Sequence, residues 1–444
     1  MTPVAKLGLA LRVAAMRRHD RWSRERLSAY QARAVMRLAR FARAHSPYYA
    51  RTLASERLEE LPILTKQQLT ASWDEIVTDR ALRLDELRRF LAGPPDVDTL
   101  FAGRYHVMST SGTTGVGTVF CYSRREWVDV MASGARLSAW RGFGPSRATR
   151  VALVMLPGGS VPPPMGARMA ASLQTLFPTT RFVDASLPMA EIVAALDAYR
   201  PDLLSAYAGT LAALAEEQLA GRLHIQPKML QSTSEVLTPT ARERITAAFG
   251  VVPHNTYAMT EAGMVAATCA EQRGLHVQDD QVIVEVLDDE NRPALPGTFG
   301  SRVLLTVLWS RTLPLVRYEI TDRVCIAPEP CPCGRGYTLI AEVDGRAGDV
   351  LTLAGERGPV HVTPSQVQRI LAHWPLVSWQ VRRRGEGLDV CVVPSEPGFD
   401  PARCKAAVRR ALIDAGAAAP PVEVQVVDHI APLPSGKLPR FVLG

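Results

Sequence analysis

Residues 105–122 read YHVMSTSGTTGVGTVFCY, and this stretch decides how the fold is interpreted. Both of its ends are rich in β-branched and aromatic residues, so we expect two strands joined by the polar centre. The centre offers hydroxyl donors, and its glycines let backbone N–H groups turn toward an anion at low steric cost. A Walker loop would need Gly-Lys-Ser or Gly-Lys-Thr at the start of a helix, which is absent. The stretch therefore predicts a phosphate-binding loop between two strands, although an ordinary Ser/Thr/Gly hairpin has the same composition.

The chain has 444 residues, of which 47% are apolar. This length is too great for a single hydrophobic core, so we expect a globular protein of two or more domains. The spacing of apolar residues predicts that residues 1–100 are mostly helical. Beyond residue 150, short apolar runs alternate with helical patterns, which predicts a layered α/β core with parallel strands. The strands expected there are residues 151–156, 203–207, 229–231 and 251–252.

The formal net charge of +7 comes almost entirely from arginine, and the arginines form no long basic block. Nucleic-acid binding is therefore disfavoured, whereas small anionic substrates suit a basic surface. No apolar run reaches the roughly 18 residues of a membrane span. Residues 6–22 are amphipathic and basic without a cleavage site, so we expect a solvated first helix, with a membrane-surface anchor as the alternative. Seven cysteines, an odd number, indicate reduced thiols or metal ligands in a cytoplasmic protein.

The centre of the opening stretch resembles the nucleotide-phosphate loop of the adenylate-forming superfamily, which contains acyl-CoA synthetases, adenylation domains and luciferases. The matching residues are Ser111, Gly112, Thr113, Thr114 and Gly115. Four later stretches occur in the expected order, and together they look most like the phenylacetate–CoA ligase-like branch. The resemblance implies an α/β fold. Residues 1–344 would form a large layered adenylation domain with a β-rich subdomain, and residues 345–444 a small mobile α+β lid.

One of these stretches, residues 231–235, reads QSTSE and would lie against the adenine ring. The family usually has Gly-Gly-Glu here, so the resemblance assigns Ser234 and Glu235 to nucleotide binding. Thr233 and Ser234 replace the two glycines, which makes a close approach of the backbone to the base harder. The structural alternative is that these side chains cap the following helix.

Another stretch, residues 255–261, reads NTYAMTE and resembles the family motif Y-G-x-T-E. The motif's tyrosine stacks on adenine, its threonine contacts phosphate and its glutamate holds Mg²⁺. Tyr257, Thr260 and Glu261 occupy these positions, and Asn255 is assigned to nucleotide binding beside them. The chemistry fits, because a hard cation prefers carboxylate oxygen and an aromatic face suits a purine. A buried tyrosine next to an N-capping Thr-Glu pair is the alternative.

The last two stretches and the closing loop supply charged residues. Residues 317–322 read RYEITD and resemble R-Y-x-x-x-D, in which the aspartate, here Asp322, accepts both ribose hydroxyls. Residues 344–349 read DGRAGD and resemble the hinge before the lid, with Arg346 as the motif arginine and Gly348 where the family usually has aspartate. Residues 434–440 read PSGKLPR and match the closing loop, whose Lys437 would stabilise charge as a carboxylate attacks the α-phosphate of ATP.

The resemblance therefore implies ATP-dependent activation of a carboxylic acid, aromatic or otherwise apolar, to an acyl-adenylate, followed by transfer to a thiol, most simply that of CoA. A ligase that uses an amine or a carrier protein as acceptor would keep every ATP motif. A catalytically dead nucleotide-binding homologue is a third interpretation, favoured by the lack of lysine in residues 116–119. The acid, the acceptor and the assembly state cannot be read from the sequence, and a homodimer stays open.

Four further residues have the composition of a structural zinc site. Cys269 and His276 flank a short segment that contains Gln-Arg-Gly, and Cys331-Pro-Cys333-Gly forms a tight knuckle with two thiols. Three sulfurs and one imidazole match the closed tetrahedral set that zinc prefers. A similar Cys-Pro-Cys-Gly sequence occurs near this place in some phenylacetate–CoA ligase-like relatives. Cys325 could replace one ligand, and ordinary buried cysteines are the alternative.

Overall fold

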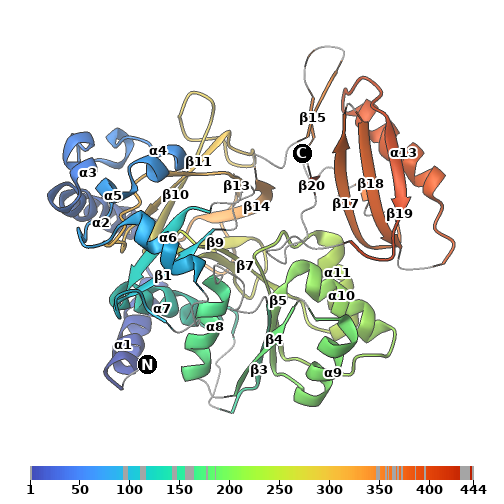
Figure 1. Cartoon of the computed structure of the whole chain (residues 1–444), viewed down its shortest axis with the longest axis horizontal. Helices are drawn as coiled ribbons and strands as arrows, with labels where there is room; N and C mark the ends of the chain where they lie inside the picture. Colours follow the sequence, from blue (N-terminus) through green and yellow to red (C-terminus); the bar gives the residue numbers. More distant parts are fainter. Residues whose placement is uncertain are drawn as a thin grey trace.

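The structure is a computed structural model. It describes residues 3–93, 99–110, 117–142, 148–155, 165–176, 179–185, 187–346, 351–355, 358, 360–362, 367, 370–371, 374–385, 387–394, 397–430 and 441–442. Figure 1 shows a large body with the N-terminal helices at one end, and a smaller C-terminal sheet with one helix at the other end.

Helices account for most of residues 3–92, as the sequence predicted. They are α1 (Pro3–His19), α2 (Arg24–His45), α3 (Pro47–Thr52), the 3-10 helix η1 (Leu58–Glu60), α4 (Lys66–Ala71), α5 (Trp73–Ile76) and α6 (Leu84–Ala92). Local chemistry fixes where they begin. The side chain of Ser23 accepts the N–H of Arg26 at the start of α2, and Thr65 and Gln68 form a capping box at the start of α4.

The predicted pair of strands around the loop is present. Strands β1 (Tyr105–Ser109) and β2 (Val119–Ser123) pair antiparallel. A capping box between Ser123 and Glu126 then begins α7 (Arg124–Trp140), so the chain leaves the hairpin directly into a long helix.

The largest sheet among the described residues has nine strands in the order β13-β14-β9-β8-β7-β6-β5-β3-β4. Strands β3 to β7 are parallel to one another, and the remaining strands pair antiparallel. Their bounds are β3 (Val151–Met155), β4 (Thr180–Asp184), β5 (Leu203–Tyr207), β6 (Met229–Thr233), β7 (His254–Met259), β8 (Gly263–Thr268), β9 (Leu275–Val277), β13 (Asp322–Ile326) and β14 (Leu339–Arg346).

Helices cover both faces of the parallel strands (Figure 1). They are α8 (Met165–Leu176), α9 (Met189–Tyr199), α10 (Ala208–Leu219) and α11 (Pro239–Phe249). In β3, Ala152 and Val154 pack in the core cluster of α9 to α11, whereas Val151 and Leu153 pack with Ala170 of α8. Because successive strand residues point to opposite faces, both faces of β3 are buried. The predicted layered α/β core is therefore confirmed.

One predicted strand is displaced. A strand is expected from the sequence at residues 251–252, but β7 begins only at His254. Gly250 ends α11 in the left-handed conformation, with φ of 68°, and Pro253 has no N–H to donate to a neighbouring strand. The residues between them leave the helix, and pairing with β6 starts after the proline.

Two further regions are rich in strands. The first is an antiparallel sheet of β10 (Val282–Leu287), β11 (Arg302–Val307) and β12 (Tyr318–Ile320), which belongs to the core of the large body. The second follows β14 and has its own hydrophobic core. Its elements are β15 (Leu351–Leu353), β16 (Val360–Val362), β17 (Leu376–Arg384), β18 (Gly387–Pro394), α13 (Pro401–Asp414), β19 (Val422–Val426) and β20 (Phe441–Val442). Strand β14 continues to Arg346, so the predicted domain boundary at residues 344/345 falls inside a strand.

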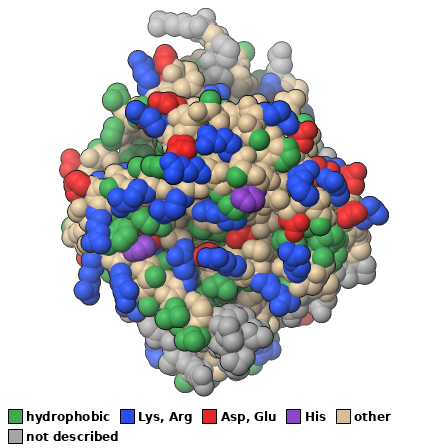
Figure 2. Space-filling model, turned by 90° about the vertical axis from the view of Figure 1, so that its left-hand side faces the viewer, with side chains coloured by type: hydrophobic (Ala, Val, Ile, Leu, Met, Phe, Trp, Pro, Cys, Tyr) green, Lys and Arg blue, Asp and Glu red, His purple; other side chains and the backbone are tan. Residues whose placement is uncertain are grey.

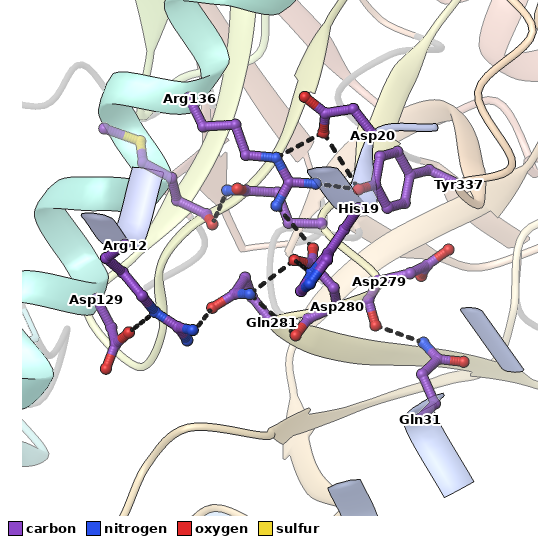
Figure 3. Close-up of polar contacts among 12 residues, drawn as sticks. Arg12, His19, Asp20, Gln31, Asp129, Arg136, Asp279, Asp280, Gln281 and Tyr337 are labelled. Atoms are coloured by element: carbon purple, nitrogen blue, oxygen red, sulfur yellow. Dashed lines mark hydrogen bonds and ion pairs between the residues drawn. The ribbon is translucent and has the colours of Figure 1, made fainter. Parts of the chain in front are cut away.

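A buried network of charged side chains, the arginine network, fastens α1 to the sheet (Figure 3). The fully buried guanidinium of Arg136 in α7 donates to Asp280 Oδ1 over 2.7 Å and to Asp20 Oδ1 over 2.8 Å, and it also contacts the hydroxyl of Tyr337. His19 Nδ1 lies 2.7 Å from Asp280 Oδ2. Burial alone would raise the pKa of Asp280, but Arg136 and His19 bring it down to about 2.

None of the helices in the part of the chain that the structure describes is long and apolar enough to cross a bilayer.

Candidate active site

The structure brings together several of the predicted site residues from different strands of the large sheet. The hydroxyl of Tyr257, in β7, donates to Asp322 Oδ2, at the start of β13, over 2.5 Å. Across the sheet, Asp322 pairs in register with Arg346 of β14. Two residues assigned to nucleotide binding, Tyr257 and Asp322, and the hinge arginine Arg346 come from three separate motifs and are neighbours in the structure.

The Thr260-Glu261 turn follows β7 directly, where parallel strands end. The hydroxyl of Tyr122, in β2, donates to the carbonyl oxygen of Thr260. After burial, the carboxylate of Glu261 is the next largest cause that raises the pKa of Tyr122, and it also raises the pKa of the buried Tyr318. The loop hairpin thus holds the turn in place, and the Glu261 carboxylate lies near two phenols. This role of Tyr122 has no signal in the sequence, because its acceptor is a backbone atom that no side-chain pattern marks.

The base of the phosphate-loop hairpin is tightly closed. The N–H of Thr110 donates to the carbonyl of Thr118 over 3.0 Å, and the N–H of Thr118 donates to Thr110 Oγ1 over 3.1 Å. A Cβ at Gly117 would lie 1.7 Å from the carbonyl oxygen of Thr110, so only glycine fits there. The predicted loop residues Ser111, Gly112, Thr113, Thr114 and Gly115 lie outside the described residues, as do Lys437 and Gly348.

The segment after β6 has an unusual backbone. Ser234 adopts a left-handed conformation, with φ of 65°, at a position where the family usually has glycine. A non-glycine residue pays roughly 1 kcal/mol for this conformation. The adjacent Glu235 accepts the N–H of Gly209, at the start of α10, through Oε2 over 2.7 Å. Thr238, and not Ser234, caps α11, so the helix-capping alternative for Ser234 is wrong.

Asn255 lies near the start of β7, at the end of the strand away from the Thr260-Glu261 turn. Its backbone N–H donates to Thr268 Oγ1 over 3.1 Å. The guanidinium of Arg141 packs beneath it and donates to Gln231 Oε1 over 2.8 Å and to Thr256 Oγ1. Burial lowers the pKa of Arg141 to about 9. Arg141 ends α7 without any motif around it, so the sequence gave no signal for this contact.

Arg317, the first residue of the RYEITD stretch, is a structural clamp. Its guanidinium forms a two-pronged contact with the Glu285 carboxylate of β10, over 3.2 and 3.0 Å. It also donates to the carbonyl of Leu61 over 2.8 Å. These contacts tie the segment before α4 to the strands that lead to Asp322, and they require the positive φ of 46° at Arg317.

The four predicted metal ligands come together, and we call them the Cys/His cluster: Cys269, His276, Cys331 and Cys333. Their candidate ligand atoms all lie within 4.8 Å of one another. The Sγ atoms of Cys269 and Cys331 are 3.7 Å apart, and Cys333 Sγ is 3.3 Å from His276 Nε2. Cys325 lies in β13, and its thiol contacts the carbonyl of Ile326 instead.

Local structure explains why these four side chains meet. His276 lies in β9, and its backbone pairs with Leu339 of β14. The knuckle before β14 closes through a turn in which the N–H of Gly334 donates to the carbonyl of Cys331 over 3.2 Å. Gly334 has φ of 77°, which favours glycine. The β9–β14 pairing therefore brings the knuckle against the segment that carries Cys269 and His276.

Comparisons with known proteins agree with this picture. No family model matches the chain. The sequence is 27% identical over 401 residues to the phenylacetate-coenzyme A ligase of Thermus thermophilus, which covers 85% of this chain and 83% of that protein.

Solved structures are similar over almost the whole chain. A 2-hydroxyisobutyryl-CoA ligase in the postadenylation state, in complex with R3-HIB-AMP, matches with a TM-score of 0.74 and 19% identity over 96% of this chain and 91% of that chain. The same ligase in the thioesterification state, with 2-HIB-AMP and CoA, matches with a TM-score of 0.59 and 21% identity over the same shares. The resemblance found in the sequence is confirmed: the chain is a homologue of phenylacetate–CoA ligase with the fold of the adenylate-forming acyl-CoA ligases.

Proposed function

We propose that this protein activates a carboxylic acid with ATP and transfers the acyl group to a thiol, most simply that of CoA. A carboxylate oxygen attacks the α-phosphorus of ATP and pyrophosphate leaves; the thiol sulfur then attacks the acyl carbon and AMP leaves. The observation that carries the proposal is the contact between Tyr257 and Asp322, in register with Arg346 and beside the Thr260-Glu261 turn. The similarity to phenylacetate-coenzyme A ligase supports an aromatic or otherwise apolar acid.

Each residue has a role that its chemistry supports. Tyr257 presents an aromatic face for adenine, and its hydroxyl holds the Asp322 carboxylate in position for the ribose hydroxyls. Thr260, fixed by Tyr122, contacts phosphate. The Glu261 carboxylate has the oxygen donors that a polyphosphate-bound Mg²⁺ prefers. Mg²⁺ would neutralise phosphate charge when bound.

The remaining assignments complete the nucleotide site. The Ser/Thr/Gly loop of residues 111–115 holds the phosphates, and Ser234, Glu235 and Asn255 border the base. Lys437, with Arg346 at the hinge, belongs to the step in which charge develops on the α-phosphate. The intact charged residues favour an active enzyme over a dead homologue.

The small C-terminal unit, residues 345–444, is proposed to act as a lid that rotates between the two half-reactions. Its separate hydrophobic core supports this division. Gly348→Pro should permit adenylate formation but slow transfer to CoA, because proline fixes φ at the hinge. Equal loss of both half-reactions would count against lid rotation.

We also propose that the Cys/His cluster holds one structural zinc ion. Three sulfurs and a ring nitrogen within 4.8 Å of one another are the size and donor set of a closed tetrahedral site. The four residues leave no position for substrate, so the ion would fasten β9 to the knuckle and do no chemistry. Elemental analysis of protein purified without added metal should find about one zinc per chain.

The test of the activity is a pyrophosphate-release screen over a panel of aromatic and aliphatic carboxylic acids. Mass spectrometry of products, with CoA and amines both present, then identifies the acceptor. Lys437→Ala should reduce adenylate formation by a factor of about 100 or more while ATP binding changes only a few-fold. Formation of an amide would show that the acceptor is an amine and not CoA. Wild-type protein that binds ATP but activates no acid would favour the catalytically dead homologue.

A further inference from the structure

The positive charge of the protein is concentrated at its N-terminal end. Residues 1–45 contain 11 of the 51 Lys and Arg residues but only two of the 44 Asp and Glu residues, a net charge of +9. The other residues contain 40 basic and 42 acidic side chains, a net charge of −2. The net charge of +7 is therefore unevenly distributed along the chain. The region of α1 and α2 is strongly cationic, and the rest of the molecule is nearly neutral.

On α2 the arginines lie along one stripe. Arg26, Arg33, Arg37 and Arg40 are exposed and follow one another at intervals of seven, four and three residues. These intervals place them on one side of the helix, over a length of about 21 Å. Only Arg40 of the four forms an ion pair with a residue that the structure describes, namely Glu56. Three of the four charges are therefore uncompensated by a carboxylate within the described chain.

The outer side of α1 continues this pattern but begins with apolar residues. Leu7, Leu11, Ala14 and Arg18 follow at intervals of four, three and four residues and are all exposed. Leu7 is 62% exposed and Leu11 is 63% exposed, whereas Leu9 and Met16 on the inner side are buried. Exposed leucines on a helix whose last turn carries Arg17 and Arg18 offer a lipid interface both an apolar and a cationic contact.

Figure 2 views the side of the molecule that is formed at the left end of Figure 1, where α1, α2 and α3 lie. Lys and Arg side chains are spread across this side, and Asp and Glu are much fewer. Cations therefore outnumber anions across this side, which makes its electrostatic field positive.

We propose that this side, the cationic face of α1 and α2, docks the protein on an anionic phospholipid bilayer. The stripes of both helices supply the cations that attract lipid phosphate, each worth a modest gain near an anionic surface. Leu7 and Leu11 supply the apolar contact that a lipid interface accepts and that an acidic protein surface does not need. The enzyme would bind peripherally, with its nucleotide site in the body behind the face.

The test is co-sedimentation of the full-length protein with sonicated vesicles. Vesicles of phosphatidylcholine with about one-third phosphatidylglycerol should bind the protein at low salt, and pure phosphatidylcholine vesicles should not. Arg33→Gln with Arg37→Gln should weaken binding about twentyfold. The matched control, Arg403→Gln with Arg409→Gln, removes two exposed arginines of α13 and should leave binding unchanged.

A second pair of variants separates insertion from simple charge attraction. Leu7→Ser with Leu11→Ser should weaken vesicle binding several-fold without any change of charge. The control Leu295→Ser removes a leucine that is 75% exposed outside this face, and it should have no effect. Failure to bind anionic vesicles would overturn the proposal, and binding of polyglutamate without binding of vesicles would assign the face to an acidic protein instead. Pyrophosphate release without vesicles reports that each variant is folded.

Discussion

The Cys/His cluster and the arginine network both contact one buried side chain, Trp140. His276 of the cluster meets the indole edge-on with ring centroids 6.0 Å apart, while the guanidinium of Arg136 lies 4.9 Å from the indole centroid. The arginine network joins α1 and α7 to the segments before β10 and β14, whereas the Cys/His cluster joins β9 and the segment before it to the knuckle. The two clusters differ in charge. The arginine network pairs a cation with carboxylates, whereas in the Cys/His cluster the candidate metal-ligand atoms of three thiols and an imidazole face one another.

This difference in charge indicates which of the two clusters needs a bound ion from outside the chain. Arg136 is compensated by Asp280 and Asp20 at hydrogen-bond distance, so the network is complete within the chain. The Cys/His cluster gathers lone pairs without an opposite charge at its centre. The zinc ion proposed above would supply that positive charge, whereas the arginine network needs no added ion.

The largest expected effect comes from breaking the Cys/His cluster. Cys331→Ser with Cys333→Ser should lose the zinc and lower the free energy of unfolding by about 5 kcal/mol or more, because the binding energy of a structural metal contributes to folding. Thermal unfolding with and without a chelator measures the change. Cys325→Ser is the control, since that buried thiol in β13 lies outside the cluster, and it should keep the zinc. Wild-type protein that contains no metal and is fully stable would contradict the proposed structural zinc ion.

Removing the guanidinium of the arginine network should have the next largest effect. Arg136→Met would leave the buried carboxylate of Asp280 with only His19 and the Gln281 amide among its described partners, so we expect a loss of about 4 kcal/mol of unfolding free energy. Chemical denaturation measures it, with the exposed Arg409→Met as the matched control. The zinc content should stay unchanged. A loss of zinc in Arg136→Met would show that the two clusters form one unit.

The two clusters were not equally visible in the sequence, for a physical reason. Cysteine is rare here, with seven in 444 residues, and two of the seven stand two positions apart, so donor type and spacing identified the cluster. The arginine network uses common residue types from segments around residues 20, 136, 280 and 337. Nothing local marks them, because tertiary packing alone selects which arginine meets which aspartate.

The fold and the active site likewise contain features that a local sequence pattern predicts and features that only tertiary packing determines. The parallel strands could be predicted because each is a short apolar run between helical patterns. The antiparallel extension could not, since β9 is short and pairs with Leu339 and Ile340, more than sixty residues away. Tyr257 and Asp322 were identified through motifs, whereas the contact of Tyr122 with the Thr260 carbonyl involves a backbone acceptor and carries no sequence signal.

Acid should weaken the arginine network in a defined range. The pKa of Asp280 is about 2 in the folded protein, below its ordinary value of 3.8, because Arg136 and His19 together outweigh the large opposing effect of burial. A lowered pKa contributes stability that is complete above the unfolded value and is lost as the pH falls through the folded value, here about 2 kcal/mol between pH 4 and pH 2. The stability difference between wild type and Asp280→Asn should shrink over that range. A difference that stays constant with pH would show that Asp280 is not ionised in the folded protein.

The smallest effect concerns Trp140, which both clusters share. A double-mutant cycle of Trp140→Phe with Arg136→Met should give a coupling energy of about 1 kcal/mol, because the phenyl ring of phenylalanine offers the guanidinium a weaker cation–π partner than indole. The corresponding cycle with Cys331→Ser should give a coupling near zero, since Trp140 meets the Cys/His cluster only through the edge contact with His276 and carries no charge. Urea unfolding of the single and double variants measures both cycles. Equal coupling to the two clusters would mean that Trp140 transmits packing changes between them, and the cluster and the network would then have to be treated as one cooperative element of the fold.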